Sequence, residues 1–295
     1  MKPSLVLLAV FATGCLSYHP RPLGEGHPGV NIAEIDGVGL RYEIHGQGPA
    51  VVLLHGFGSS LETWFRQVPL LAREHRLLLL DLKGFGFSAR PPGDYSPREQ
   101  ARLVFGLMDK LGLDKAAVVA HSWGASVALE MALSRPERVD KLVLVSAWVF
   151  PEQVPVGLRW AQLPGLGEMI FGLFYAERPE EKMALAFYRP EKLPQKLVEM
   201  VEESMDWPGT QAAALAAVRG LDFEQRLSRH AQVSQPVLLL WGREDAVALV
   251  EFGLKLERQL PRARLVVFEQ CGHFPMFEAA SAFDRELTAF LGGEK

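Results

Sequence analysis

Ala116-Ala-Val-Val-Ala-His-Ser-Trp-Gly-Ala125 is the stretch that decides the fold of this chain. It begins as an apolar run typical of a buried strand and ends at Ser122, and the composition of residues 126–133 is typical of a helix. A serine between a strand and a helix, with small residues two positions before and after it, indicates a nucleophile elbow. Such a turn lifts the serine oxygen clear of the sheet and aims the helix N-terminus at a reacting carbonyl. Ala120 stands where glycine is usual, so the pattern needs support from elsewhere.

Two later apolar runs end in loops that carry ionisable side chains. Residues 237–241 run into a loop with Asp245, and residues 265–268 run into a loop with His273. The order Ser, Asp, His is that of a hydrolytic triad. Because strand ends are rigid, they can hold three such side chains within hydrogen-bond reach. We therefore predict that Ser122 is the nucleophile, His273 its base, and Asp245 the acid that orients the base.

An upstream strand opens into a glycine-rich loop, Val51-Val-Leu-Leu-His-Gly-Phe-Gly58. Such a loop can present the backbone N–H of Phe57 to an oxyanion that forms during the reaction. The N–H of Trp123, the residue after the nucleophile, is the expected second donor. His55 is expected to support the shape of the loop.

The chain resembles the α/β-hydrolase superfamily over Ile32 to Leu291, in its capped serine hydrolase or esterase branch. Five motifs in the right order carry this resemblance: His55-Gly-Phe-Gly58, Asp81-Leu-Lys-Gly-Phe-Gly-Phe-Ser88, His121-Ser-Trp-Gly124, Trp241-Gly-Arg-Glu-Asp245 and Gly272-His-Phe-Pro275. In the second motif, Lys83 replaces the more usual arginine. The resemblance implies an α/β fold with a mostly parallel sheet, helices on both faces and an inserted helical cap. It implies no metal and no organic cofactor.

Length and composition fit one large α/β domain with an insertion. The chain has 295 residues, of which 48% are hydrophobic and 22% charged, and its formal net charge is −4. No run of Lys or Arg exceeds two residues, so nothing indicates a nucleic-acid partner. The expected partner is a small ester-like molecule.

The first residues have the pattern of a secretory signal. Residues 1–14 combine a basic start with an apolar run too short to span a bilayer, and they end in small residues before Cys15. The Ala12-Thr-Gly-Cys15 ending resembles a bacterial lipobox, which implies lipidation of Cys15. Residues 15–30 are rich in Pro and Gly and are typical of a tether. We expect a lipid-anchored protein of the bacterial cell envelope, and Leu16 favours the outer membrane. An ordinary signal peptide and an uncleaved anchor are the alternatives.

The order of the apolar segments predicts one core that an insertion interrupts. Strand and helix patterns alternate through residues 31–149 and 229–295, which indicates a sheet covered on both faces. Residues 150–228 contain helix-like stretches broken by Pro and Gly, which predicts a cap above the strand ends. We expect a continuous helix over 60–74 and expect the apolar side chains of the cap mostly to form its own core.

Other side chains offer alternative roles at the same sites. Asp245 could instead cap the following helix, but residues 146–150 after the preceding strand contain no carboxylate that could replace it in a triad. Asp81 is expected to anchor the glycine turn after its strand, and Cys271 to be a small buried filler. His121 is expected to point away from the nucleophile.

The predicted function is serine-dependent hydrolysis of a carboxylic ester with a small or medium apolar group. Carbon–carbon bond hydrolases and haloperoxidase-like esterases use the same triad and are the enzymatic alternatives. A hydrolase-fold binding protein without turnover is a remote alternative, because such proteins usually lose a member of the triad.

Overall fold

The structure is a computed structural model that describes residues 30–175 and 178–293. The expected signal peptide, the lipidation site Cys15 and the tether as far as residue 29 lie outside these ranges. No helix in the described ranges is long and apolar enough to cross a membrane.

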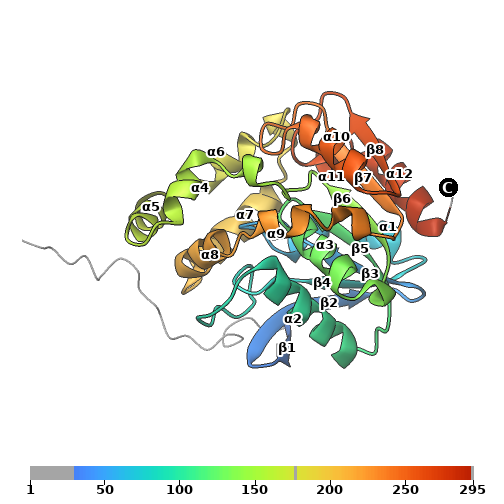
Figure 1. Cartoon of the computed structure of the whole chain (residues 1–295), viewed down its shortest axis with the longest axis horizontal. Coiled ribbons are helices and arrows are strands. Elements are labelled where there is room, and N and C mark those ends of the chain that lie inside the picture. Colours follow the sequence, from blue (N-terminus) through green and yellow to red (C-terminus); the bar gives the residue numbers. More distant parts are fainter. Residues whose placement is uncertain (1–29, 176–177, 294–295) are drawn as a thin grey trace, which may run out of the picture.

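The described strands form one eight-stranded sheet with the order β1-β2-β4-β3-β5-β6-β7-β8 (Figure 1). Only the β1–β2 and β2–β4 pairs are antiparallel, and the remaining pairs are parallel. The central strands are unbroken apolar runs because both of their faces are buried. The strands span β1 Asn31–Ile35, β2 Val38–His45, β3 Ala50–Leu54, β4 Arg76–Leu80, β5 Ala116–His121, β6 Val139–Val145, β7 Val237–Gly242 and β8 Ala263–Phe268.

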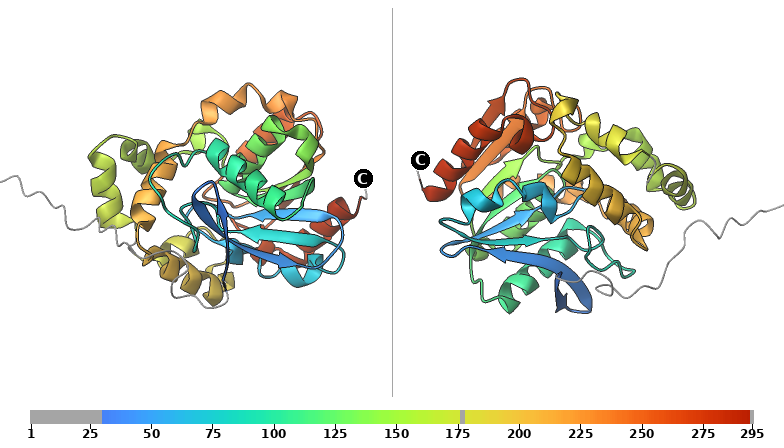
Figure 2. Two further views of the ribbon diagram at one scale, coloured as in Figure 1. Left: turned by 90° about the horizontal axis from the view of Figure 1, so that it is seen from below. Right: turned by 180° about the vertical axis from the view of Figure 1, so that it is seen from behind.

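Helices cover both faces of this sheet, and each face has its own apolar core. One core contains Phe105, Leu129 and Leu256, which come from α2 (Pro97–Lys110), α3 (Gly124–Ser134) and α10 (Val250–Gln259). The other lies under α1 (Val68–Leu71), α11 (Pro275–Glu278) and α12 (Ala280–Gly292). Figure 2 shows these two helical layers from two further sides. The predicted α/β-hydrolase architecture is thereby confirmed.

The regular structure in the described residues between β6 and β7 consists of helices alone, and in Figure 1 these helices lie together beside the sheet. This is the inserted cap that the sequence predicts. Its helices are η3 Pro151–Gln153, α4 Val156–Ala161, α5 Leu166–Phe174, α6 Pro179–Ala184, η4 Pro190–Lys192, α7 Gln195–Met205, α8 Thr210–Arg219, α9 Phe223–Leu227 and η5 His230–Gln232.

One expectation from the sequence is wrong. The helix expected over 60–74 is broken into η1 (Leu61–Trp64) and α1. Pro69 has no N–H to donate, and its ring clashes with the carbonyl one helical turn earlier, so one helix cannot continue from η1 through this position. The apolar side chains of the cap divide between its interior and its surface: Phe171 and Phe187 are buried, whereas Trp160 and Phe174 are 57% and 58% exposed.

Candidate active site

The turn between β5 and α3 has the backbone geometry of a nucleophile elbow. Ser122 has a φ of 52°, in the left-handed region that residues other than glycine seldom occupy. Hydrogen bonds hold it there: its N–H donates to Val145 O at 2.9 Å, and its carbonyl accepts from Trp148 N at 3.0 Å. Such strain persists where the surroundings over-determine it, and it is concentrated at functional sites. Ala120 is fully buried in β5, so its methyl group is accommodated where glycine is usual.

Gly124 explains how the elbow lies so close to the next strand end. A Cβ at this position would lie 2.4 Å from His55 O and 3.1 Å from Leu54 O. Any side chain would therefore push α3 away from the loop after β3. Gly56 in that loop also leaves no room for a side chain, because a Cβ there would lie 3.0 Å from the Cβ of Ser122. The two glycines bring the loop with Phe57 against the nucleophile.

Asp245 and His273 form the expected buried pair. Nδ1 of His273 lies 2.9 Å from Oδ2 and 3.1 Å from Oδ1 of Asp245. Because an ionised carboxylate can only accept, Nδ1 carries the proton and Nε2 is left as the basic nitrogen. Both side chains are almost completely buried. A carboxylate held in this way orients the imidazole and stabilises the imidazolium that forms when it takes a proton.

Asp245 also contacts the backbone at the start of the segment that leads to the next helix, as the alternative capping role requires. Its Oδ1 accepts hydrogen bonds from Val247 N at 2.9 Å and Ala248 N at 2.8 Å, in the turn that leads to α10. These donors help to fix the position of the carboxylate. Asp245 is therefore both the partner of His273 and the anchor of its own loop.

The elbow meets the histidine loop through His121. Its Nε2 lies 2.9 Å from the carbonyl oxygen of His273, and the two ring centroids are 4.8 Å apart. Among the hydrogen bonds between described residues, none joins Ser122 Oγ to His273. Catalytic hydrogen bonds are often long without substrate and tighten in the Michaelis complex. The structure thus places the loop of the Asp245–His273 pair against the residue that precedes Ser122, and the catalytic roles of the three residues stay predictions.

Two backbone N–H groups beside the elbow have no acceptor in the described structure, those of Phe57 and Trp123. Both could therefore donate to an oxyanion, and their assignment to an oxyanion hole stays a prediction. His55 fixes the loop: its Nδ1 donates to Gly56 O at 2.7 Å, and its Nε2 accepts from Leu82 N at 2.9 Å. Burial lowers the pKa of His55 to about 4, which keeps the imidazole neutral in this dual role.

Asp81 is the anchor of the glycine turn rather than part of a triad. Its Oδ2 accepts from Phe87 N at 2.8 Å, and its Oδ1 accepts from Leu61 N at 2.7 Å. Burial raises its pKa to about 6, which the Arg41 guanidinium at 3.3 Å opposes. Arg41 also binds Glu62 on η1. No sequence motif pointed to Arg41 or Glu62, since they meet Asp81 only through the fold.

Aromatic rings surround the oxyanion loop. The ring of Phe57 packs edge-on against Phe85, Trp123, Trp148 and Tyr175 at centroid distances of 5.3 to 6.3 Å. Tyr175 follows α5, so the cap reaches down to this loop. Burial raises the pKa of the Tyr175 hydroxyl, which stays neutral. The side chains beside the expected oxyanion hole are therefore mainly apolar.

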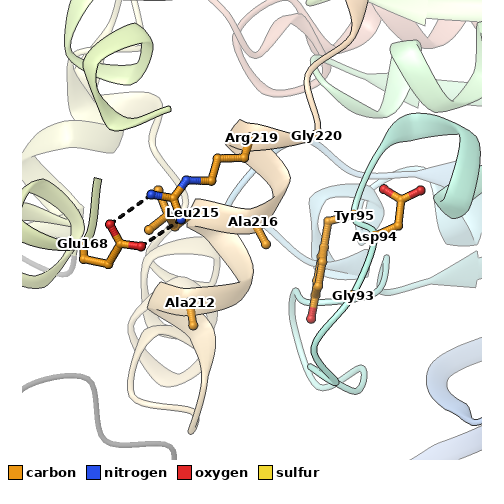
Figure 3. Close-up of a pocket in the computed structure, with 9 residues that line it drawn as sticks. All are labelled: Gly93, Asp94, Tyr95, Glu168, Ala212, Leu215, Ala216, Arg219 and Gly220. Atoms are coloured by element: carbon orange, nitrogen blue, oxygen red, sulfur yellow. Dashed lines mark hydrogen bonds and ion pairs between the residues drawn. The ribbon is translucent and has the colours of Figure 1, made fainter. Parts of the chain in front are cut away.

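Other candidate groups do not join this site. Cys271 is fully buried, and burial raises the pKa of its thiol, as suits a filler and not a nucleophile. Within the described residues no three His, Cys, Asp or Glu side chains could together hold a metal ion. The groove in Figure 3, of about 490 Å³ between α8 and Gly93–Tyr95, contains no triad residue. On its wall Arg219 binds Glu168 at 2.8 Å and ties α8 to α5.

Several known proteins similar to this chain are hydrolases. It is 31% identical to a 2-hydroxy-6-oxononadienedioate/2-hydroxy-6-oxononatrienedioate hydrolase of Cupriavidus pinatubonensis, over 82% of this chain and 86% of that protein. It is also 31% identical to a 2-hydroxymuconate semialdehyde hydrolase of a Pseudomonas species, over 88% and 93%. A solved meta-cleavage product hydrolase of Pseudomonas fluorescens superposes with a TM-score of 0.78 at 27% identity, over 90% of this chain and 98% of that one.

The family assignment follows from a match across the core and the cap. The family model described as the alpha/beta hydrolase fold matches residues 49–280, which include the glycine-rich loop, the elbow, Asp245 and His273. The sheet order and the inserted cap agree with this match. The chain is therefore an enzyme that belongs to the α/β-hydrolase family.

Proposed function

We propose that this enzyme is a serine hydrolase in which Ser122 attacks a carbonyl carbon. His273 takes the serine proton and passes it to the leaving group, while Asp245 holds the imidazole. Water then attacks the acyl-enzyme with His273 as its base, which releases the acid and returns the proton to Ser122. The N–H groups of Phe57 and Trp123 bind the oxyanion, and removing one such donor typically costs about 2.7–4 kcal/mol of barrier stabilisation. The observation that carries the proposal is the buried Asp245–His273 pair beside a strained serine elbow.

Carbon–carbon bond hydrolysis is the reaction that the relatives favour. Several relatives at 30 to 32% identity are named as hydrolases of 2-hydroxy-6-oxo dienoic acids. In such a molecule Ser122 would attack the carbon of the 6-oxo group, and the oxygen of that group would become the oxyanion. The conjugated hydroxy-dienoate can take up the electron pair of the broken bond, and His273 can return the proton to the departing carbon. This reading replaces ester hydrolysis as the leading proposal.

Ester hydrolysis remains the second candidate because of the charges around the site. A dienoic acid is an anion, and its carboxylate needs a cationic or hydrogen-bonding partner. The buried Arg90 already donates to Ser88 O, Gly86 O and Thr210 Oγ1 at 2.7 to 3.0 Å. The rings around Phe57 carry no charge. An uncharged apolar acyl group would fit this wall without a counter-charge.

Labelling with a fluorophosphonate tests the nucleophile. The wild-type enzyme is expected to label, and Ser122→Ala is expected not to. Ser134→Ala, at the exposed C-terminal end of α3, is the matched control and should label like wild type. Equal labelling of Ser122→Ala and wild type, or no labelling of wild type, would contradict the mechanism.

A comparison of two substrate classes decides between carbon–carbon bond hydrolysis and ester hydrolysis. We expect kcat/KM for 2-hydroxy-6-oxo-6-phenylhexa-2,4-dienoate to exceed that for nitrophenyl esters of any chain length. The loss of the dienoate chromophore and the release of nitrophenolate report the two reactions. A larger kcat/KM for an ester in the series would reverse the assignment in favour of an esterase.

We propose in addition that the enzyme is held by lipid at Cys15 in the bacterial cell envelope. The support is the sequence alone: an apolar run, small residues before a cysteine, and a Pro/Gly-rich tether after it. Cys15→Ser should remove acyl-chain incorporation from a labelled fatty acid and change the processing of the leader. Unchanged incorporation would exclude lipidation at this residue.

A further inference from the structure

The outer sides of α4 and α5 expose a set of large apolar side chains. Each is more than half exposed to solvent, although the cap has a buried interior of its own. We call this set the apolar cap face, and its members are Val156, Trp160, Leu163, Met169, Leu173 and Phe174. Large apolar side chains exposed together on two adjoining helices indicate an interaction site in a folded protein.

Helical spacing explains why these side chains point outward. Val156 and Trp160 are one turn apart on α4, and Met169 and Leu173 are one turn apart on α5. The opposite side of α5 packs against α8, where a Cβ on Gly167 would lie 2.9 Å from Leu215 Cδ1. In Figure 1, α5 lies at the outer end of the cap, with α8 between it and the sheet.

The apolar cap face carries little charge. Arg159 and Glu168 are the only charged residues of α4 and α5. Glu168 pairs with Arg219, and Arg159 donates to the backbone carbonyls of Val154, Pro151 and Glu152. A single arginine offers little complementarity to a polyanion or a strongly charged protein. The donors of Arg159 keep their carbonyl partners when an uncharged apolar medium covers the helices.

The chain that precedes β1 indicates which medium this is. An apolar run ends at Ala12, and the expected lipidation site Cys15 lies 16 residues before Asn31. At about 3.3–3.6 Å per residue, this segment spans at most about 58 Å. A lipid at Cys15 would therefore keep the domain close to a bilayer. A tether of this length makes the second contact intramolecular and raises its effective concentration.

We propose that the apolar cap face docks onto the lipid bilayer to which the N-terminal segment tethers the enzyme. This inference rests on the proposed anchor and not on which bond the enzyme cleaves. Trp160 would lie at the level of the headgroups, where an indole ring can meet both water and acyl chains. The leucine, methionine and phenylalanine side chains around it would enter the acyl boundary.

Docking on this face would place the active site next to the lipid. The inner side of α5 carries Phe171, whose ring stacks on Tyr175 at 5.0 Å, and Tyr175 packs against Phe57 of the oxyanion loop. One helix would thus contact lipid on its outer side and the site on its inner side. The substrate class that this arrangement serves is an apolar molecule dissolved in the membrane.

Fluorescence quenching in vesicles tests the proposal with the full-length protein. Wild type and Trp160→Phe are each reconstituted into phosphatidylcholine vesicles with plain or brominated acyl chains. The difference in emission between the two proteins reports Trp160. We expect brominated lipid to reduce this difference at least two-fold. Flotation of the vesicles measures anchoring separately.

Two leucine substitutions make the test specific. Leu173→Glu is expected to abolish the quenching of Trp160 while flotation and fluorophosphonate labelling stay unchanged. Leu249→Glu, at a leucine that is 50% exposed just before α10, should leave the quenching intact. Flotation without quenching would overturn the proposal even if the anchor is correct, and so would failure of the wild type to float. Equal effects of the two glutamates, or shielding of Trp160 by a second copy of the chain in cross-linked dimers, would also overturn it.

Discussion

Nε2 of His121 donates a hydrogen bond to the carbonyl oxygen of His273 at 2.9 Å, so the residue before the elbow serine supports the loop of the expected base. A carbonyl can only accept, which places the ring proton of His121 on Nε2. Burial, and then the charge of His273, lower the pKa of His121 well below its usual value. His121 is thus a neutral donor beside an imidazole that becomes a cation during the reaction.

We expect His121→Leu to lower kcat by roughly two- to tenfold with little change in KM. The leucine would fill the space, but it would leave the carbonyl of His273 without its donor and the imidazole free to drift. The loss of one such hydrogen bond, about 0.5–1.5 kcal/mol, corresponds to this change in rate. Steady-state kinetics across pH would measure kcat, KM and the acid limb of the profile.

His121→Gln is the matched variant, because its side-chain amide can place an N–H near the position of Nε2. It should recover most of the lost kcat, whereas a purely structural role would show as equal losses of stability in both variants. If the glutamine enzyme is as slow as the leucine enzyme, or if the leucine enzyme keeps wild-type kcat, then His121 does not position the base.

Asp245→Asn should separate the two roles of this carboxylate. The amide can still accept from Val247 N and Ala248 N, but it no longer stabilises an imidazolium and favours the wrong tautomer of His273. We expect kcat to fall by roughly 10⁴, as for the same change in other triads, with little loss of thermal stability. Asp245→Ala should be equally inactive and also melt several degrees lower. Residual activity above one tenth of wild type in Asp245→Asn would exclude Asp245 as the acid.

The sequence was sufficient for the sheet and for the loops that end at the site. A buried strand that leads into a loop with ionisable side chains can be recognised from a short stretch of sequence. The strands that lead to Asp245 and His273 end where the sequence predicts. The helix expected over 60–74 failed because tertiary contacts outweighed its periodicity. The backbone N–H of Leu61 donates to Asp81, and Pro69 begins a new helix instead of continuing η1.

Contacts between distant segments lay outside the reach of sequence patterns. Nothing in the sequence around His121 shows that its ring meets His273, which is 152 residues away. The same holds for Arg41, whose guanidinium meets Asp81 across the sheet edge. The exposure of Trp160 could not be predicted either, because an apolar residue in a helix has the same signature whether its face is covered or not.

Acid should destabilise the enzyme between pH 6.5 and pH 4, partly through His55. Its pKa falls from 6.5 to about 4 on folding. Below pH 6.5 the His55 side chain is protonated in the unfolded chain but stays neutral in the native protein. The free energy of unfolding therefore decreases as the pH falls through this window. The full shift corresponds to about 3 kcal/mol. Urea unfolding at pH 7.5, 6 and 5 would measure how the free energy of unfolding depends on pH.

His55→Gln is the control for this pH dependence. It should be less stable than wild type at pH 7.5, but its free energy of unfolding should fall less on acidification. A pH dependence as steep as that of wild type would show that other groups cause it.

Gly124→Ala should damage both stability and activity. The new methyl group would lie 2.4 Å from the backbone oxygen of His55, which cannot rotate away, so α3 or the oxyanion loop must move. We expect a loss of about 1–3 kcal/mol, which is typical of overpacking, and slower labelling of Ser122 by fluorophosphonate. Gly172→Ala in α5 is the matched control, because nothing lies within 4 Å of its Cβ and alanine favours a helix by about 1 kcal/mol. Denaturant unfolding of the two variants should therefore change in opposite directions. If Gly124→Ala were as stable and as reactive as wild type, the close approach of the elbow to the loop of Phe57 would not be what forms this site.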